Sequence, residues 1–311
     1  MTGNAALSAA RSADPGSEEA LADANLRALA AEPVTIRQPR GAKVPFIFAS
    51  PHSGRFYPLS FAQSSRLDAI SLRRSEDAFV DELFDCVTEL GAPLICARFP
   101  RAFVDANRAP GELDPAMFDA PLSAVGPRSA RVAAGLGVIP RVVRDGLEIY
   151  GTRLPAGEAA FRLEHFYRPY HTALSELVEQ TRAEFGVAVV IDCHSMPPPA
   201  KAHDIVLGDC YGEAAAPELI GQTQKILSGL GFSVARNAPY AGGYTTHLYG
   251  RPREGVHAIQ IEVSRALYLD ENLMEKSVGF VSCRERLRVF AGKLLAETGS
   301  GLKAARRAAQ L

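Results

Sequence analysis

The apolar segment Val187-Ala188-Val189-Val190-Ile191 is the feature that most constrains how this chain can fold. A continuous run of mostly β-branched residues indicates a strand that is buried on both faces, as in a sheet covered by helices on either side. Further candidate strands occur at 44–49, 93–99, 205–207, 232–235 and 258–263. Helical patterns separate most of these runs, so we expect an α/β fold built on a mainly parallel sheet.

Residues 75–90 carry apolar side chains at helical spacing. We expect a helix there that is capped by Ser75 and has Glu76 and Asp77 in its first turn. A long helical stretch over 157–184 contains Pro169, which predicts a kink or an interruption. Two more helices are expected at 214–229 and 272–296, and a hairpin over 138–150 that turns at Asp145-Gly146.

The chain is expected to form one catalytic domain over residues 41–300. Residues 1–40 read as an N-terminal tail that is partly flexible or forms a short Ala-rich helix over 18–31. Residues 301–311 are expected to continue as a C-terminal helical end.

Composition excludes several classes of protein. A net charge of −1 and a pI near 6.7 provide no overall field for nucleic acid or anionic lipid. The five cysteines are scattered and odd in number, which favours free thiols in a reducing compartment. Neither a spanning apolar run nor a signal-type apolar stretch is present, so we expect a soluble, cytoplasmic protein that acts on a small molecule. The sequence does not define its oligomeric state.

Polar residues follow the predicted strands, where ligands bind in open α/β sheets. His52 follows the first apolar run, and His194 follows the strand at 187–191. With one carboxylate from Glu76 or Asp77, the two histidines predict a site for a divalent metal, most readily zinc. Either histidine alone would be better explained as an ordinary loop residue.

Two residues beside His194 have different expected roles. Successive side chains of a strand point to opposite faces, so Cys193 should point away from His194 and act as a small buried residue. Asp192 falls on the same face as His194, where it could orient the imidazole ring. It could equally cap a neighbouring loop.

Glu262 is the leading candidate for a general base, because an unpaired carboxylate within the apolar run 259–263 would be costly to bury. The alternative is a structural ion pair with Arg265 or Arg251. Those arginines are also candidates for holding a substrate carboxylate. Tyr244 and His247 follow a Gly-Gly pair and are candidate substrate contacts on a flexible loop, or parts of a plain connection.

Ten segments in order resemble the N-formylglutamate amidohydrolase (N-formylglutamate deformylase) family over about 44–275. They are 50–54 (SPHSG), 75–77 (SED), 80–83 (VDEL), 104–108 (VDANR), 169–171 (PYH), 192–197 (DCHSMP), 204–209 (DIVLGD), 242–244 (GGY) with 247–252 (HLYGRP), and 260–265 (QIEVSR).

The resemblance implies a fold like that of the zinc carboxypeptidases, with a mixed sheet between helices, and hydrolysis of an N-acyl amino acid amide. It implies that His52 and His194 are metal ligands and that Glu262 is the general base. Asn107 and Arg108 resemble a pair that binds a substrate carboxylate or polarises a carbonyl group. For the middle ligand we prefer Asp77, with Glu76 as the alternative.

Three functional hypotheses follow. The first is a zinc-dependent amidohydrolase that converts N-formyl-L-glutamate, or another short N-acyl amino acid, to the free amino acid. The second is a related metallohydrolase that acts on another N-acyl amino acid or a peptide end. The third is a binding protein that retains the pocket without turnover.

Overall fold

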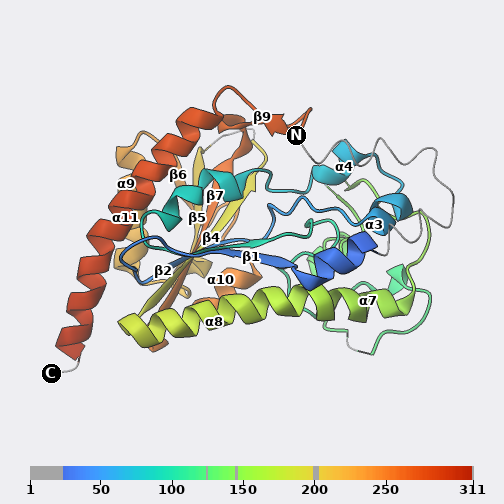
Figure 1. Ribbon diagram of the computed structural model, residues 1–311, viewed down its shortest axis with the longest axis horizontal. Coiled ribbons are helices and arrows are strands. Elements are labelled where there is room, and N and C mark those ends of the chain that lie inside the picture. Colours follow the sequence, from blue (N-terminus) through green and yellow to red (C-terminus); the bar gives the residue numbers. More distant parts are fainter. Residues whose placement is uncertain (1–23, 124, 144–145, 199–202, 310–311) are drawn as a thin grey trace. The chain divides into compact units, whose positions relative to one another are not determined.

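The structure is a computed structural model that describes residues 24–123, 125–143, 146–198 and 203–309. Seven strands form one sheet in the order β1-β3-β2-β4-β7-β5-β6 (Figure 1). Their bounds are β1 Val34–Arg37, β2 Phe46–Ser50, β3 Leu94–Ala97, β4 Ala188–Met196, β5 Ile205–Gly208, β6 Val234–Arg236 and β7 Val256–Ser264. The pairs β2–β3, β2–β4, β4–β7 and β5–β6 are parallel, whereas β5 and β7 are antiparallel. The predicted mixed, mainly parallel sheet is therefore confirmed.

Contacts within the chain divide it into two compact units. The first comprises the residues up to Thr35 together with His52–Glu76 and Ala97–Tyr170, and the second comprises Ile36–Pro51, Asp77–Cys96 and His171–Leu311. One catalytic domain over 41–300 therefore stays a prediction. Of the predicted N-terminal helix, residues 24–31 are helical, and its first part lies outside the described residues.

Helices cover both faces of the sheet in the second unit, as predicted (Figure 1). On one face lie α5 (Val80–Leu83), the 3₁₀ turn η1 (Asp85–Thr88), α9 (Pro217–Gly229) and α11 (Phe280–Ala309). On the other lie α8 (Arg168–Phe185) and α10 (Tyr244–Tyr249), and α10 packs against β4 and β7. The short elements η5 (Cys210–Gly212), η6 (Pro252–Glu254), η7 (Arg265–Leu267), β8 (Leu269–Asp270) and β9 (Glu275–Lys276) complete this unit.

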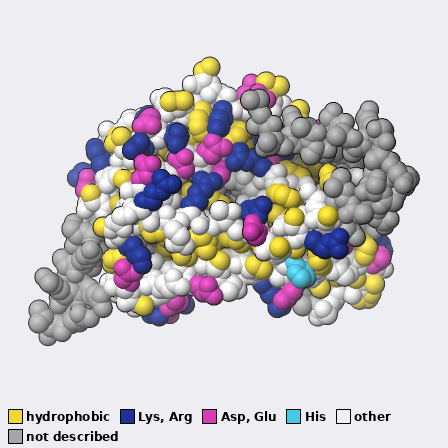
Figure 2. All heavy atoms as spheres, in the orientation of Figure 1, with side chains coloured by type: hydrophobic (Ala, Val, Ile, Leu, Met, Phe, Trp, Pro, Cys, Tyr) yellow, Lys and Arg dark blue, Asp and Glu magenta, His cyan; other side chains and the backbone are white. Residues whose placement is uncertain are grey.

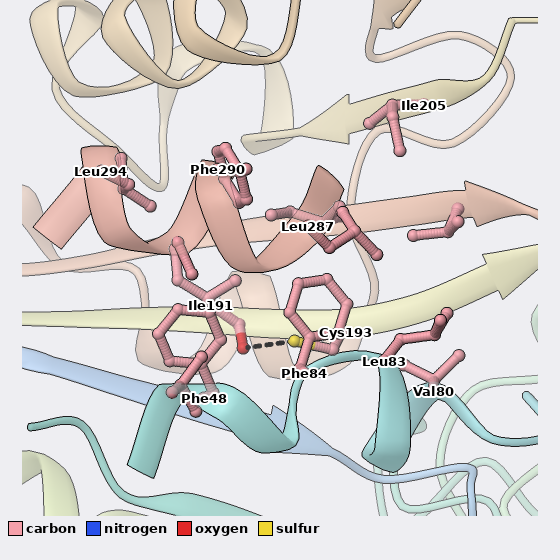
Figure 3. Packing of buried hydrophobic residues seen from close by; sticks show 14 of the residues in the cluster. Phe48, Val80, Leu83, Phe84, Ile191, Cys193, Ile205, Leu287, Phe290 and Leu294 are labelled. Atoms are coloured by element: carbon pink, nitrogen blue, oxygen red, sulfur yellow. Dashed lines mark hydrogen bonds between the residues drawn. The ribbon is translucent and has the colours of Figure 1, made fainter. Parts of the chain in front are cut away.

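The hydrophobic core lies between the sheet and the α5, α9 and α11 side (Figure 3). Alternate residues of β4, namely Val189, Ile191 and Cys193, point into it with Phe48 of β2. Because strand side chains alternate, the neighbouring residues of β4 point to the other face. Cys193 is fully buried among apolar residues, which confirms its predicted role.

The first unit is built from short helices around an aromatic cluster. Its helices are α3 (Leu59–Ser64), α4 (Ala69–Arg73), η2 (Pro115–Met117), α6 (Ala130–Ala133) and α7 (Ala156–Arg162). Phe103 packs against Phe61 and Phe166, with ring centroids 5.2 and 5.1 Å apart. The guanidinium of Arg162 lies 4.2 Å from the Phe103 ring centroid and donates to the Tyr150 hydroxyl, so its charge is satisfied inside the cluster.

The long helical stretch changes to a π-helical turn shortly before Pro169, the residue at which a kink or interruption was predicted. Helix α7 passes into a π-helical turn, η4 (Leu163–Tyr167), which leads into α8. Pro169 is the second residue of α8 and has no N–H to donate to the preceding turn. A π turn beside a proline is one way to accommodate that missing donor.

The predicted continuous helix over 75–90 is wrong, because only α5 is α-helical and the separate 3₁₀ turn η1 follows it. The helix begins only at Val80, and Phe79 before it has a left-handed backbone with φ of 62°. Glu76 and Asp77 therefore lie in a turn and not in a helical first turn. Their side chains are engaged in buried tertiary contacts, which outweigh local helix propensity.

Other predicted elements differ mainly at their ends. Helix α9 replaces the predicted 214–229, and α11 begins at Phe280 instead of 272 and extends to Ala309. Within 138–150 there is one antiparallel bridge, between Val142 and Glu148, in place of two strands. Asp145 at the predicted turn lies outside the described residues.

All five cysteines are free, as predicted. Within the described part of the chain, the helices are too short or too polar to cross a membrane. On the face in Figure 2, basic and acidic side chains lie interspersed, in keeping with the net charge of −1.

Truncating the core residue Leu287 on α11 tests this packing. Leu287 is fully buried, so Leu287→Ala is expected to lower the free energy of unfolding by about 2–5 kcal/mol through lost burial and a residual cavity. Val281 on the same helix is 69% exposed, so Val281→Ala is the matched control, with a change within about 0.5 kcal/mol. Urea denaturation followed by circular dichroism measures both, and equal midpoints would contradict the assigned core.

Candidate metal centre and active site

Among the residues that the structure describes, one group of three could hold a metal ion. It consists of His52, Asp77 and His194, all buried, and one ligand atom from each lies within 4.8 Å of the other two. His52 comes two residues after β2, Asp77 lies in the turn before α5, and His194 is on β4. The structure thus brings together the two histidines and the preferred carboxylate named from sequence.

His194 contacts a carboxylate through each ring nitrogen. Its Nδ1 lies 2.9 Å from Asp77 Oδ2, and its Nε2 lies 3.0 Å from Asp192 Oδ2. Asp192 precedes His194 by two residues on β4 and shares its face, as the alternation of strand side chains predicts. A carboxylate on the second nitrogen fixes the ring orientation and the tautomer of a metal-binding histidine.

His52 is held by a second carboxylate that sequence reasoning did not single out. Its Nε2 lies 2.8 Å from Asp105 Oδ1, while Arg101 Nε and the backbone N–H of Asn107 also donate to Asp105. Burial opposes the charged form of Asp105, but Arg101 and His52 outweigh it and hold its pKa well below the usual range. The available signal was the position of Asp105 after the strand at 93–99.

The neighbouring carboxylates Glu76 and Asp77 face different partners. Glu76 accepts hydrogen bonds from the Tyr57 hydroxyl at 2.6 Å and from Arg73 Nε at 3.1 Å. Burial raises the pKa of Glu76, although Arg73 counteracts it. Asp77 instead faces His194, so the geometry favours Asp77 over Glu76 as the middle ligand.

Glu262 lies beside His194 in the sheet. The two are register partners on the parallel strands β4 and β7, and the pair Asp192 and Gln260 precedes them. Register partners on neighbouring strands lie about 5 Å apart and share a face. Gln260 Nε2 donates to Glu262 Oε1 at 2.8 Å, so the carboxylate is oriented within a buried polar layer.

Arg108 is buried in the first unit and is held by backbone carbonyl groups. Its Nε donates to Leu136 O at 3.0 Å and its Nη1 to Asn107 O at 2.9 Å. Burial lowers the pKa of Arg108, while Asp105 opposes that effect. Asn107 follows Asp105 closely, and so both predicted residues belong to the segment that supports His52.

The two candidate arginines for a substrate carboxylate are placed differently. Arg265 donates to Asp77 Oδ1 at 3.2 Å and to Ser195 Oγ at 3.1 Å. Arg251 pairs with Glu179 and forms a bridge with Val256, the first residue of β7. Six residues of strand, on the order of 20 Å, separate Val256 from Glu262. Arg251 is therefore not brought to Glu262.

Tyr244 and His247 belong to α10, which corrects the expectation of a flexible loop. This helix packs on β4 and β7, the strands that carry His194 and Glu262. His247 is exposed, and Tyr244 packs edge-on against His171, with ring centroids 5.8 Å apart. A role for either residue in substrate binding stays a prediction.

Proton release on metal binding tests the histidine assignment. In the metal-free protein, burial lowers the pKa of His194, but Asp192 and Asp77 outweigh burial and raise this pKa well above 6.5. The stability that this charge contributes is present below a pH of about 6.5 and is lost as the pH rises through the folded-state pKa. A ligating imidazole must be neutral, so zinc binding is expected to expel the proton. Below that pKa, zinc affinity should rise roughly tenfold for each unit by which the pH increases.

Calorimetric titration with zinc in buffers of different ionisation enthalpy counts the released protons. His257 serves as the control, because it pairs with Val189, five residues before His194 along β4, and burial alone lowers its pKa. His257→Gln should therefore leave the released proton count unchanged. Binding without proton release at pH 7 would contradict the assignment.

Comparisons with known proteins agree with the resemblance seen in the sequence. The sequence model of the N-formylglutamate amidohydrolase family matches residues 44–269. The chain is 29% identical over 239 residues to an N-formylglutamate deformylase of Pseudomonas aeruginosa, which covers 74% of this chain and 84% of that protein. It is also 29% identical over 241 residues to one of Pseudomonas putida, covering 74% of this chain and 83% of that protein.

Solved structures extend this likeness to three dimensions. The N-formylglutamate amidohydrolase of Ralstonia eutropha JMP134 superposes with a TM-score of 0.82 at 33% identity, covering 86% of this chain and 99% of that one. A protein of Agrobacterium tumefaciens, at 20% identity and a TM-score of 0.65, shares the fold over 87% of this chain and 96% of its own. The chain therefore belongs to the N-formylglutamate amidohydrolase family.

Proposed function

We propose that this protein hydrolyses N-formyl-L-glutamate to formate and glutamate, with one zinc ion held by His52, Asp77 and His194. The observation that carries the proposal is the buried ligand group, with Glu262 in register beside His194. The family relationship supports the choice of substrate, because the relatives are N-formylglutamate deformylases.

The residues present suit a zinc ion. Two imidazoles and one carboxylate form a common donor set for catalytic zinc, which keeps a further position for water or substrate. His52 contacts Asp105 through Nε2, so Nδ1 is the ligand atom that we infer for this ring. His194 contacts Asp192 through Nε2 and turns Nδ1 toward Asp77, so both rings have the same arrangement.

A zinc ion bound by these residues would make water acidic and the formyl carbonyl group more electrophilic. In the reaction, a water oxygen joins the formyl carbon, the C–N bond breaks, and the amine nitrogen gains a proton. Glu262 accepts the proton from the attacking water and returns it to the leaving nitrogen. The hydrogen bond from Gln260 Nε2 to Oε1 holds the carboxylate in place for both transfers.

Arg108 is proposed to stabilise the negative charge that develops on the formyl oxygen, with Asn107 beside it in substrate binding. The fixed, buried guanidinium supports this role, because a donor that is already oriented costs no reorganisation during the reaction. Tyr244 and His247 are proposed to contact the substrate from α10. We place the reaction in the cytoplasm, following the free thiols and the composition.

Substitution of His194 and of Glu262 separates metal binding from proton transfer. His194→Ala is expected to lose stoichiometric zinc and formate release together. Glu262→Gln keeps the shape of the side chain, so it should retain zinc while kcat falls about 10²- to 10⁴-fold. Metal analysis of purified protein and a formate-release assay measure the two effects, with Glu176→Gln, at an exposed position of α8, as a matched control.

Four outcomes would contradict the proposal. Full activity of a metal-free preparation would exclude the zinc site, and near-normal kcat in Glu262→Gln would exclude Glu262 as the base. A panel of N-formyl, N-acetyl and peptide substrates identifies the preferred acyl group. Faster turnover of an N-acetyl amino acid or a peptide would favour the related metallohydrolase, and tight binding without hydrolysis would favour a binding protein.

A further inference from the structure

The two oxygens of Asp77 have different surroundings. Oδ2 faces His194 Nδ1 at 2.9 Å. Oδ1 accepts hydrogen bonds from Ser195 Oγ at 3.1 Å and from Arg265 Nη2 at 3.2 Å. One oxygen therefore faces the ligand group, while the other is occupied by two donors.

These two donors are themselves connected. Arg265 Nε donates to Ser195 Oγ at 3.1 Å, so the guanidinium, the hydroxyl and Asp77 Oδ1 form a closed triangle. The side chains of Asp77 and Arg265 are 1% and 4% exposed. Charge-assisted hydrogen bonds in such a dry setting are strong and directional.

The sheet brings the triangle together. Ser195 is next to the last residue of β4, and Arg265 directly follows the last residue of β7. These strands are parallel and in register, so both residues lie where the carboxyl ends of the two strands form one edge of the sheet. Asp77 is carried to that edge by the turn before Phe79, whose left-handed backbone starts α5 at Val80.

Charge balance gives the triangle a role beyond packing. Asp77 and Asp192 each have an oxygen within 3.0 Å of His194, so two carboxylates lie beside one imidazole. Their combined negative charge needs a further positive partner. Arg265 supplies a positive charge to Asp77, and its Nη1 also lies 3.5 Å from Glu271. These contacts engage Arg265 with two carboxylates of the protein, and its role in holding a substrate carboxylate stays a prediction.

We propose that Arg265 and Ser195 are positioning residues that hold Asp77 by Oδ1, so that Oδ2 alone is presented to the metal. This inference rests on the proposed metal site, but it does not depend on which substrate is hydrolysed. It assigns to Arg265 a role in metal affinity and ligand geometry.

The test measures metal binding directly in the full-length protein. Arg265→Gln is expected to weaken zinc affinity about 10- to 100-fold, the usual effect of losing a group that supports a ligand. Ser195→Ala removes one uncharged donor and should weaken it about 2- to 10-fold. Competition with a chromophoric chelator gives the dissociation constants. The absorption spectrum of the cobalt(II)-substituted protein reports whether the ligand geometry has changed.

Arg284→Gln is the matched control. Arg284 forms a bidentate pair with Asp85 on the α11 side of the sheet, so its loss should leave zinc affinity and the cobalt(II) spectrum unchanged. Arg265→Lys keeps the charge but cannot reproduce the guanidinium fork, so it should recover only part of the affinity. Ser195→Ala keeps the test decisive if Arg265→Gln does not fold.

The outcomes separate this inference from the proposed function. Wild-type zinc affinity and cobalt(II) spectrum in both variants would overturn the positioning role, and a raised KM confined to substrates with a side-chain carboxylate would return Arg265 to substrate binding. If the variants lose affinity while the wild type releases no formate, the positioning role is supported and the proposed function falls. If the wild type binds no metal, both are overturned.

Discussion

The parallel pairing of β4 with β7 places His194 and Glu262, two residues of the candidate site, side by side. Nine residue pairs run in register from Ala188 and Val256 to Met196 and Ser264. Since side chains alternate along a strand, one set packs into the core with α11, while the other set includes the polar residues Asp192, His194, Gln260 and Glu262. A slip of one residue would place His194 in the core and Cys193 in the site.

The polar layer is stable because its charges are matched. Burying an unpaired carboxylate is costly, and here Asp192 faces His194 and Asp77 faces Arg265. Within the first unit, Asp105 is matched in the same way by His52 and Arg101. The same pairings orient each group. Removing one partner would therefore leave its neighbour both destabilised and misdirected.

Much of the fold was predictable, because buried parallel strands produce continuous apolar runs. The apolar run at 187–191 predicted a strand that was too short, since β4 extends to Met196. The added part contains the polar residues Asp192 and His194 of the candidate site. The expected helix over 75–90 failed at Phe79, where the backbone turns left-handed and Asp77 is drawn into contacts with His194 and Arg265. Local periodicity carries no information on contacts with residues more than 100 positions away.

The sequence by itself determined the mainly parallel sheet, and it singled out His52, His194 and Glu262 as polar residues at or near the ends of apolar strands. Spacing and chemistry alone allowed either Glu76 or Asp77 beside the histidines, and the family resemblance made Asp77 the preferred one. The tertiary structure separates the two side chains, because Glu76 contacts Tyr57 and Arg73 whereas Asp77 faces His194. It also decided that Arg265 is engaged with Asp77, because a side chain's role depends on the partner that folding places within hydrogen-bond distance.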